Sequence, residues 1–264
     1  MLSTLGASNF PGAKEPMHTR KLQLWFAYPG DLADECVAAA CAGLLSPEEQ
    51  LRFGSRSHCL SSLTGRALAR IALSHTHPLP PGGWQFVANA HGKPSALPEC
   101  GLRFNLSNAV DLVACLVAVG AEVGVDIEPH TRAAQILRIA PKVFSPVEQA
   151  QLSVLPSVAR ADRALSLWTL KEAYTKARGL GLLLPLDKIS FCFGYEAGVH
   201  MELEPEIADD PARWTFCLLN HAGHRVALMM EQGYATGLTM LEVRPPLAAP
   251  SLVHSAALGW FPWN

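Results

Sequence analysis

The sequence lacks the long apolar runs, the paired cysteines and the strong net charge that would each define a class of protein. It contains no run of about 18 apolar residues, so no transmembrane helix of ordinary length is expected. The net charge is only −2 over 264 residues. So low a charge argues against a bulk nucleic-acid binder and against a polybasic membrane protein.

The seven cysteines include no CxxC pair. Their odd number and loose spacing favour reduced thiols and a cytoplasmic protein over a disulfide framework. The closely spaced histidine pairs, His75 with His77 and His221 with His224, have no Cys or Glu beside them at zinc-ligand spacing, so no zinc site is expected. Residues 1–19 lack a continuous apolar segment, and we interpret them as a flexible leader rather than a signal peptide.

What is present is the composition of a globular protein, 49% hydrophobic and 17% charged, in a chain long enough for one large domain or two ordinary ones. Charge is uneven, because residues 129–180 hold eight basic residues against three acidic ones. The basic residues are Arg132, Arg138, Lys142, Arg160, Arg163, Lys171, Lys176 and Arg178, and the acids are Glu148, Asp162 and Glu172. This excess indicates an anionic ligand or partner, although a chance fluctuation on a solvated surface accounts for it equally well.

Two pairs of segments repeat in the same order. "LSPEEQLRF" (residues 45–53) resembles "FSPVEQAQL" (residues 144–152), and each has the signals of a capped helix start. "FNLSNAVDLVACLVA" (residues 104–118) resembles "FCLLNHAGHRVALMM" (residues 216–230), and each indicates a β-hairpin. The repeats predict an α+β protein of two similar halves, with a substrate site at their interface.

The predicted boundaries are a leader at 1–19, an N-terminal half at 20–124, a C-terminal half at 125–244 and a Pro-rich tail at 245–264. Helices are expected at 46–53, 61–76, 146–152 and 164–180, and strands at 21–29, 84–94, 103–119, 123–128, 188–193, 200–205, 213–219, 225–231 and 237–243. The strand at 123–128 is assigned to the first half. The tail is expected to cross the surface, with Trp260, Phe261 and Trp263 in a groove.

The stretch "VGVDIEP" (residues 123–129) predicts a strand that carries two acids. Side chains alternate between the two faces of a strand. Val125 and Ile127 therefore point to one face, whereas Asp126 and Glu128 point together to the other.

A second acidic site lies in "LSLWTLKEAYTKARG" (residues 165–179). Helical spacing gives a core face of Leu167, Leu170, Tyr174 and Ala177, and a second face of Trp168, Glu172 and Lys176. The simplest interpretation is an exposed helix with a Glu-to-Lys pair worth about 0.3–0.5 kcal/mol. Trp168 disagrees with it, because a large aromatic on that face indicates that the face is partly covered.

If Glu172 faces Asp126 and Glu128, three carboxylates converge and raise each other's pKa. A divalent cation would remove the repulsion. Carboxylate oxygens without thiolates favour Mg²⁺ first and Mn²⁺ second. Mg²⁺ also keeps open positions for phosphate oxygens of a ligand. Lys176, one turn further on, would contact the same phosphate, and the chemistry indicated is metal-assisted attack at a phosphoryl group.

"GVDIE" (residues 124–128) followed by "WTLKEAYTKARGLGL" (residues 168–182) resembles the two-part signature of the Sfp-type 4′-phosphopantetheinyl transferase family, including a separation of about 40 residues. "LTGRALAR" (63–70), "HGKP" (91–94), "FNLSN" (104–108) and "FSPVEQ" (144–149) extend the resemblance to most of the chain. It implies the fold of that family, two pseudo-twofold-related α/β halves with the active site between them.

The resemblance also implies a function, the transfer of the phosphopantetheine arm of coenzyme A to a serine of an apo acyl or peptidyl carrier protein, with release of 3′,5′-ADP. Asp126, Glu128 and Glu172 would bind Mg²⁺; Glu172 or a metal-bound water would help deprotonate the serine, and Lys176 would stabilise the phosphate. Lys93, Pro94, Ser107 and Asn108 would contact coenzyme A, and Arg52 and Arg56 its 3′-phosphate. Residues 179–193 would face the carrier, and a monomer would suffice.

Two residues depart from the family pattern. Asn108 stands where the family usually has histidine, so a positive charge toward the phosphate is lost, and Ser61 stands where many members carry a basic residue. Asn108 matches Asn220 in the repeat, so a purely structural role stays open, as it does for the Lys93 turn. The alternatives for the whole chain are a Mg²⁺-dependent phosphohydrolase of nucleotides or pyrophosphates and an inactive, carrier-binding relative.

Overall fold

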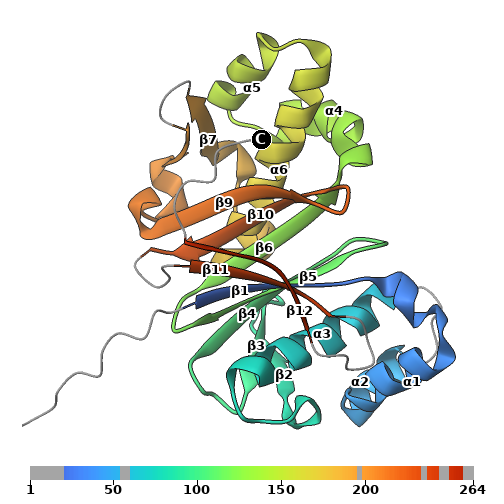
Figure 1. Ribbon diagram of the computed structural model, residues 1–264. Coiled ribbons are helices and arrows are strands. Elements are labelled where there is room, and N and C mark those ends of the chain that lie inside the picture. Colours follow the sequence, from blue (N-terminus) through green and yellow to red (C-terminus); the bar gives the residue numbers. More distant parts are fainter. Residues whose placement is uncertain (1–20, 54–59, 195–197, 233–236, 244–249, 258–264) are drawn as a thin grey trace, which may run out of the picture.

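The computed structural model describes residues 21–53, 60–194, 198–232, 237–243 and 250–257 (Figure 1). The elements of the first half are β1 (Lys21–Ala27), α1 (Glu35–Gly43), α2 (Pro47–Phe53), α3 (Leu60–Thr76), β2 (Gln85–Ala88), β3 (Pro94–Leu97), β4 (Leu102–Asn108) and β5 (Val113–Val119). Those that follow are β6 (Val123–Pro129), α4 (Ala133–Val143), α5 (Pro146–Ser153), α6 (Ser157–Arg178), β7 (Ile189–Gly194), β8 (Gly198–Leu203), β9 (Trp214–His221), β10 (His224–Glu231), β11 (Gly237–Glu242) and β12 (Ser251–Ala257). This mixture of helices and antiparallel strands confirms the α+β fold class.

Three strands of the first large sheet are arranged in the same order as the three strands of the second. The first runs β12-β11-β1-β5-β4 and the second β6-β10-β9, so β1-β5-β4 corresponds to β6-β10-β9. In each half a long helix, α3 or α6, precedes a two-stranded sheet, β2-β3 or β7-β8, which precedes the hairpin. The order of elements is therefore repeated, and the pseudo-twofold relation between the halves stays a prediction.

Three segments join different sheets from those expected. β6 pairs antiparallel with β10, Asp126 opposite Ala227, and so opens the second sheet instead of ending the first. β11 runs parallel to β1, and β12, inside the predicted tail, pairs with β11. The physical reason is that β11 supplies the partner that the free edge of β1 needs. The leader 1–19 and the residues Trp260, Phe261 and Trp263 lie outside the described residues.

Two helices were not predicted, and one is longer than expected. α1 has a signal that could have revealed it, since the side chain of Asp34 accepts from the backbone N–H of Cys36 and caps the helix. α4 lacks a side-chain cap and contains Pro141, so its sequence carries no start signal. α6 begins at Ser157 rather than at residue 164, directly after Pro156.

The molecule is built in four layers, helices outside and the two larger sheets inside (Figure 1). Apolar residues of β1, β5 and β11 pack against those of β6 and β10 to form the central core. On the outer faces, α3 covers the first sheet and α6 the second. Among the helices in the described segments, none is both long and apolar enough to cross a membrane.

Candidate functional site

The strand β6 divides its side chains as the alternation predicts. Val125 and Ile127 are buried in the core between the two sheets. Asp126 and Glu128 point to the other face, toward α6, and are only 5% and 6% exposed. Two carboxylates are thus held in the interior, where leaving them uncompensated is costly.

A glycine in β6 lets α6 lie close to these carboxylates. A Cβ on Gly124 would lie 2.0 Å from the carbonyl oxygen of Ala173 and 2.5 Å from the amide nitrogen of Ala177. Both distances are far below van der Waals contact, so only glycine fits there. Gly124 of the GVDIE motif therefore sets the spacing between the strand and the helix.

The helix α6 presents the two faces that its spacing predicts. Leu167, Leu170, Tyr174 and Ala177 are all buried, which confirms the core face. On the second face, the indole Nε1 of Trp168 donates a hydrogen bond of 2.7 Å to Glu128 Oε1. The exposed-helix interpretation of this face is therefore wrong, because β6 covers it.

The first half contributes to the site through β4. Ser107 Oγ lies 3.0 Å from Asp126 Oδ1 and accepts a hydrogen bond from the backbone N–H of Ile127. Asn105 Oδ1 accepts from the backbone N–H of Val125 at 2.9 Å. Side chains of one sheet therefore satisfy the free edge of β6 in the other, and the acidic site lies where the two sheets meet.

Asp126 is satisfied on one oxygen only. Its Oδ1 lies 2.7 Å from Lys176 Nζ, which also lies 2.9 Å from Ser107 Oγ. Its Oδ2 is buried and has no hydrogen-bond partner among the described residues. A buried carboxylate oxygen without a partner is rare in folded proteins and calls for an explanation such as a bound ion.

Glu172 completes the acidic cluster. Burial, and then the charge of Asp126, raise the pKa of Glu172 to about 7, and Lys176 only partly opposes the rise. The same two causes raise the pKa of Glu128, although its carboxylate pairs with Arg132 at 2.5 Å and binds Trp168. Glu172 therefore lies near enough to Asp126 and Glu128 to feel both charges, and the joint binding of a cation by the three stays a prediction.

The donors fit a hard divalent cation. All three side chains offer carboxylate oxygens, and the unpartnered Asp126 Oδ2 is one of them. Oxygen donors of this kind suit Mg²⁺ and Mn²⁺. Fold and site together define an α+β protein with an acidic, lysine-flanked cluster between β6 and α6, where the two sheets meet.

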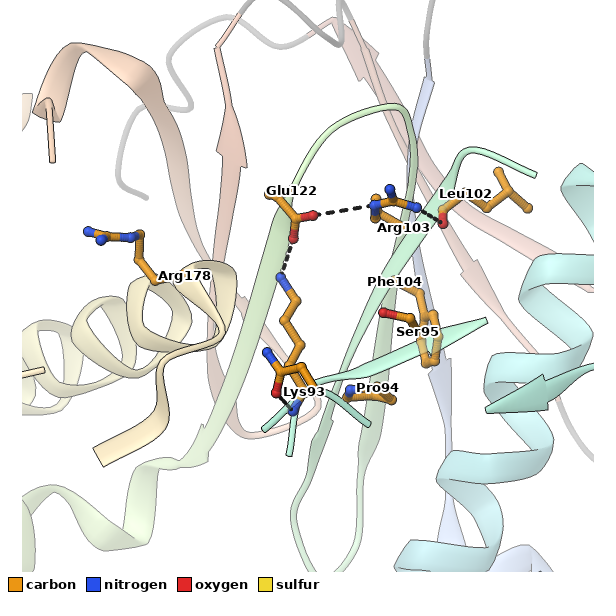
Figure 2. Close-up of a pocket in the computed structure, with 9 residues that line it drawn as sticks. Lys93, Pro94, Ser95, Leu102, Arg103, Phe104, Glu122 and Arg178 are labelled. Atoms are coloured by element: carbon orange, nitrogen blue, oxygen red, sulfur yellow. Dashed lines mark hydrogen bonds and ion pairs between the residues drawn. The ribbon is translucent and has the colours of Figure 1, made fainter. Parts of the chain in front are cut away.

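Lys93 and Pro94 lie apart from this cluster, in a pocket of about 180 Å³ beside Glu122 (Figure 2). The ammonium of Lys93 lies 2.5 Å from Glu122 Oε2 and donates to the carbonyl oxygen of Ala177 at 2.7 Å. Burial lowers the pKa of Lys93, and the bond to Glu122 opposes that shift. The turn at Lys93 therefore has a structural role, because its lysine connects the first half to the C-terminal end of α6.

The structure says less about the three remaining predicted coenzyme A contacts, which are Asn108, Arg52 and Arg56. Asn108 is exposed at the end of β4, and its Oδ1 lies 2.9 Å from where a Cβ on Gly65 would stand. It lies opposite Val113 as Asn220 lies opposite Arg225, so the repeat positions match. The side chain of Arg52 and the whole of Arg56 fall outside the described residues, so their roles stay predictions.

The ion pair between Lys171 and Glu148 was not predicted. Lys171 Nζ lies 2.7 Å from Glu148 Oε2, and both side chains are fully buried. Lys171 also donates to the carbonyl oxygens of Leu186 and Ile189. The capping box at Ser145 is confirmed and uses the same Glu148. A signal for this pair was available, since a lysine inside the apolar part of a helix needs a buried partner.

The predicted basic segment is largely neutralised within the protein. Lys171, Lys176, Arg178 and Arg132 each pair with a carboxylate. Arg138 and Lys142 of α4 are exposed, and among the described residues no ion pair is recorded for them. The local excess of charge therefore overstates the number of cations available to a partner.

Comparisons with known proteins agree with the motif. The sequence model of the 4′-phosphopantetheinyl transferase superfamily matches residues 122–235. A 4′-phosphopantetheinyl transferase of Bacillus subtilis is 33% identical over 161 residues, which are 59% of this chain and 68% of that protein. The transferase Sfp of Bacillus subtilis strain 168 is 30% identical over 162 residues, 60% of this chain and 71% of Sfp.

A shorter match, to the transferase AcpT of Escherichia coli K12, is 39% identical and covers 44% of this chain and 56% of AcpT. A solved holo-acyl-carrier-protein synthase complex with coenzyme A, from Chronobacterium ammoniagenes, aligns with 42% of this chain and 95% of that chain at 20% identity and a TM-score of 0.36. The chain belongs to the 4′-phosphopantetheinyl transferase superfamily, which confirms the family that the motif indicated.

Proposed function

We propose that this protein transfers the 4′-phosphopantetheine arm of coenzyme A to a serine of an apo acyl or peptidyl carrier protein, with Mg²⁺ as cofactor. The serine oxygen attacks the phosphorus that bears the pantetheine arm. The pyrophosphate bond breaks, and 3′,5′-ADP leaves. The names of the relatives support the transfer, and the acidic site supports the cation.

A single observation carries the proposal, the buried and unpartnered Oδ2 of Asp126 beside two further carboxylates and Lys176. Buried carboxylate oxygens without a partner are uncommon in folded proteins, and this one lies beside further acidic side chains that a cation could bridge. A bound Mg²⁺ would neutralise the carboxylates and withdraw charge from the pyrophosphate. Asp126, Glu128 and Glu172 would hold it, and Mn²⁺ would be a substitute.

The other groups have roles that follow from their charge and position. Glu172, or a water on the cation, would accept the serine proton. Lys176 would turn from Asp126 toward the phosphate and stabilise the charge that the broken bond leaves. Ser107 holds both Asp126 and Lys176 and so orients them.

Coenzyme A would extend from this cluster across the first half. Ser107 and Asn108 end β4 beside it, and Lys93 and Pro94 line the pocket at Glu122. A ligand phosphate would have to compete with Glu122 for the ammonium of Lys93. Arg52 and Arg56 are the proposed contacts of the 3′-phosphate, and the segment 179–193 with exposed Arg138 and Lys142 would face the acidic carrier.

The test is a transfer assay with a panel of apo carriers, coenzyme A and Mg²⁺, followed by mass spectrometry. The proposal expects one carrier to gain the mass of a single phosphopantetheine arm, with an equal amount of 3′,5′-ADP. Rapid 3′,5′-ADP release without any carrier would instead indicate the phosphohydrolase. Tight carrier binding with no mass increase would indicate an inactive relative.

A further inference from the structure

The hairpin of β7 and β8 carries three different metal-binding side chains on one face. The sulfur of Cys192, a ring nitrogen of His200 and a carboxylate oxygen of Glu202 all lie within 4.8 Å of one another. We propose that these residues form a second metal site, for a zinc-type divalent cation, separate from the acidic site and independent of the proposed transfer activity.

The register of the hairpin brings the donors together. Cys192 lies directly opposite His200, and Ser190 directly opposite Glu202. Opposite residues share a face of the sheet, and so do residues two apart on one strand. The other face is fixed by Phe191, Val199 and Met201, which are buried in the core against α6. The donor face is therefore set by the fold and not by chance side-chain positions.

The spacing suits a four-coordinate cation. Zinc binds thiolate sulfur at about 2.3 Å and nitrogen or oxygen at about 2.0–2.2 Å, so a tetrahedral site places the sulfur about 3.6 Å from each of the other donors. His200 Nε2 and Glu202 Oε1 already lie 3.1 Å apart. Donors within 4.8 Å need to approach by at most about 1.2 Å, which the exposed side chains of His200 and Glu202 can supply, and three protein donors leave a fourth position for water.

Accessibility also fits. His200 and Glu202 are more than half exposed, while Cys192 is buried at the base of the group. A cation can enter from solvent through the two exposed donors and reach the sulfur. A thiolate and a carboxylate together carry two negative charges, which a divalent cation neutralises. The sulfur selects zinc-type ions over the Mg²⁺ preferred by oxygen donors.

In the absence of a cation the thiol keeps its proton. Burial, and then the charge of Glu202, raise the pKa of Cys192 to about 11. Binding would form the sulfur–metal bond and release that proton to solvent. No local sequence pattern indicates this site, because the cysteine and histidine come from opposite strands and are not neighbours in the chain.

The expected consequence is a more stable hairpin, because the cation would link β7 to β8. β7 and β8 form a two-stranded sheet, an arrangement that is marginally stable by itself. On its outer edge, β7 is bound by α5, where Glu148 accepts from the backbone N–H of Phe191 and Gln151 from that of Phe193. A cation across Cys192 and His200 would fix β8 to β7 by a second attachment, and would stabilise the folded protein by linkage.

Cobalt is the probe, because a cobalt–thiolate bond gives a near-ultraviolet charge-transfer band that carboxylate ligands do not. The full-length, reduced protein is titrated with Co²⁺ while excess Mg²⁺ occupies the acidic site. One equivalent should produce the band, and Zn²⁺ should abolish it. Cys192→Ser should remove the band, and His200→Gln or Glu202→Gln should weaken Co²⁺ binding more than about tenfold.

Cys36→Ser and His91→Gln are the matched controls, since both residues are exposed and lie on other elements. Both should bind Co²⁺ as the wild type does. The exposed positions His200 and Glu202 keep the test valid if Cys192→Ser fails to fold. Absence of the band in the wild type, or unchanged binding in both His200→Gln and Glu202→Gln, would overturn the site.

Discussion

Two neighbouring residues of α6, Lys171 and Glu172, are both charged and both covered, yet they lie in opposite kinds of environment. Lys171 points to α5 and finds Glu148 and two carbonyl oxygens. Glu172 points to β6 and finds two further carboxylates. Lys171 has its polar contacts supplied within the fold, whereas Glu172 adds a third carboxylate to two that Lys176 and Arg132 already balance.

The difference separates a structural site from a functional one. A buried ion pair that is fully hydrogen-bonded is explained by the fold alone. Three carboxylates against two cations, with one buried oxygen unpartnered, leave negative charge that the fold does not compensate. That excess is accounted for if a ligand outside the chain, here a divalent cation, supplies the missing charge.

The largest expected effect is on activity at Glu172. Glu172→Gln should lower the transfer rate about 10²-fold or more, because a cation ligand and a base are lost together. Stability should stay the same or rise, because one like charge is removed. Carrier modification followed by mass spectrometry measures the first, and urea denaturation the second. Glu206→Gln, at an exposed position, is the control and should change neither.

The opposite pattern is expected at Lys171. Lys171→Met should lower the free energy of unfolding by about 3–5 kcal/mol, because Glu148 would remain buried without its partner. Adding Glu148→Gln should recover part of that loss. Urea denaturation of the two variants checks both statements. A loss below about 1 kcal/mol for Lys171→Met would contradict the assignment of this pair to stability.

The strand-to-helix contact gives an intermediate effect. Gly124→Ala should destabilise the fold by about 1–3 kcal/mol or more, since the new methyl group would meet backbone atoms of α6. Transfer should fall as well, because α6 carries Glu172 and Lys176. Gly30→Ala is the matched control, with open space around the added carbon. Equal stability of the two variants would show that α6 can move away from β6 freely.

The acidic cluster should also leave a pH signature. Because the pKa of Glu172 is raised in the folded state, its contribution to stability is present at low pH and is lost as pH rises from about 4.5 through about 7. Mg²⁺ should reverse that loss, so it should raise the melting temperature more at pH 8 than at pH 5.5. Glu172→Gln should reduce this difference. Equal Mg²⁺ effects at both pH values would contradict the cluster.

The smallest effect concerns Asn108. If it faces a phosphate of coenzyme A, Asn108→His should tighten coenzyme A binding by up to about fivefold at low pH, as expected for one partly exposed charge. Isothermal titration at pH 6 and pH 8 provides the comparison. Unchanged affinity at both would support a structural role, in agreement with its contact to Gly65 and its match with Asn220.

The sequence predicted most of the acidic site because its signals are local. The period of two in β6 and the period of 3.6 in α6 place Asp126, Glu128, Glu172 and Trp168 on defined faces. The sequence motifs also indicated the family correctly. The capping box at Ser145 and the core face of α6 followed from short-range rules as well.

What the sequence did not reveal depends on pairing between distant segments. The pairing of β11 with β1 joins residues more than 200 positions apart, and no local pattern specifies that partner. The same applies to the bonds of Lys93 to Glu122 and of Lys171 to Glu148, because a charged residue in the sequence does not name its partner. Those contacts form only when segments distant in the sequence fold together.

The central claim, that Asp126, Glu128 and Glu172 hold a cation used in phosphopantetheine transfer, is tested most directly by one measurement. The initial rate of carrier modification is followed by mass spectrometry while Mg²⁺ is titrated, for the wild type and for Asp126→Asn. We expect a rate that vanishes without Mg²⁺ and saturates with it in the wild type, and no appreciable rate in Asp126→Asn. Transfer that is independent of Mg²⁺, or undiminished in Asp126→Asn, would contradict the claim.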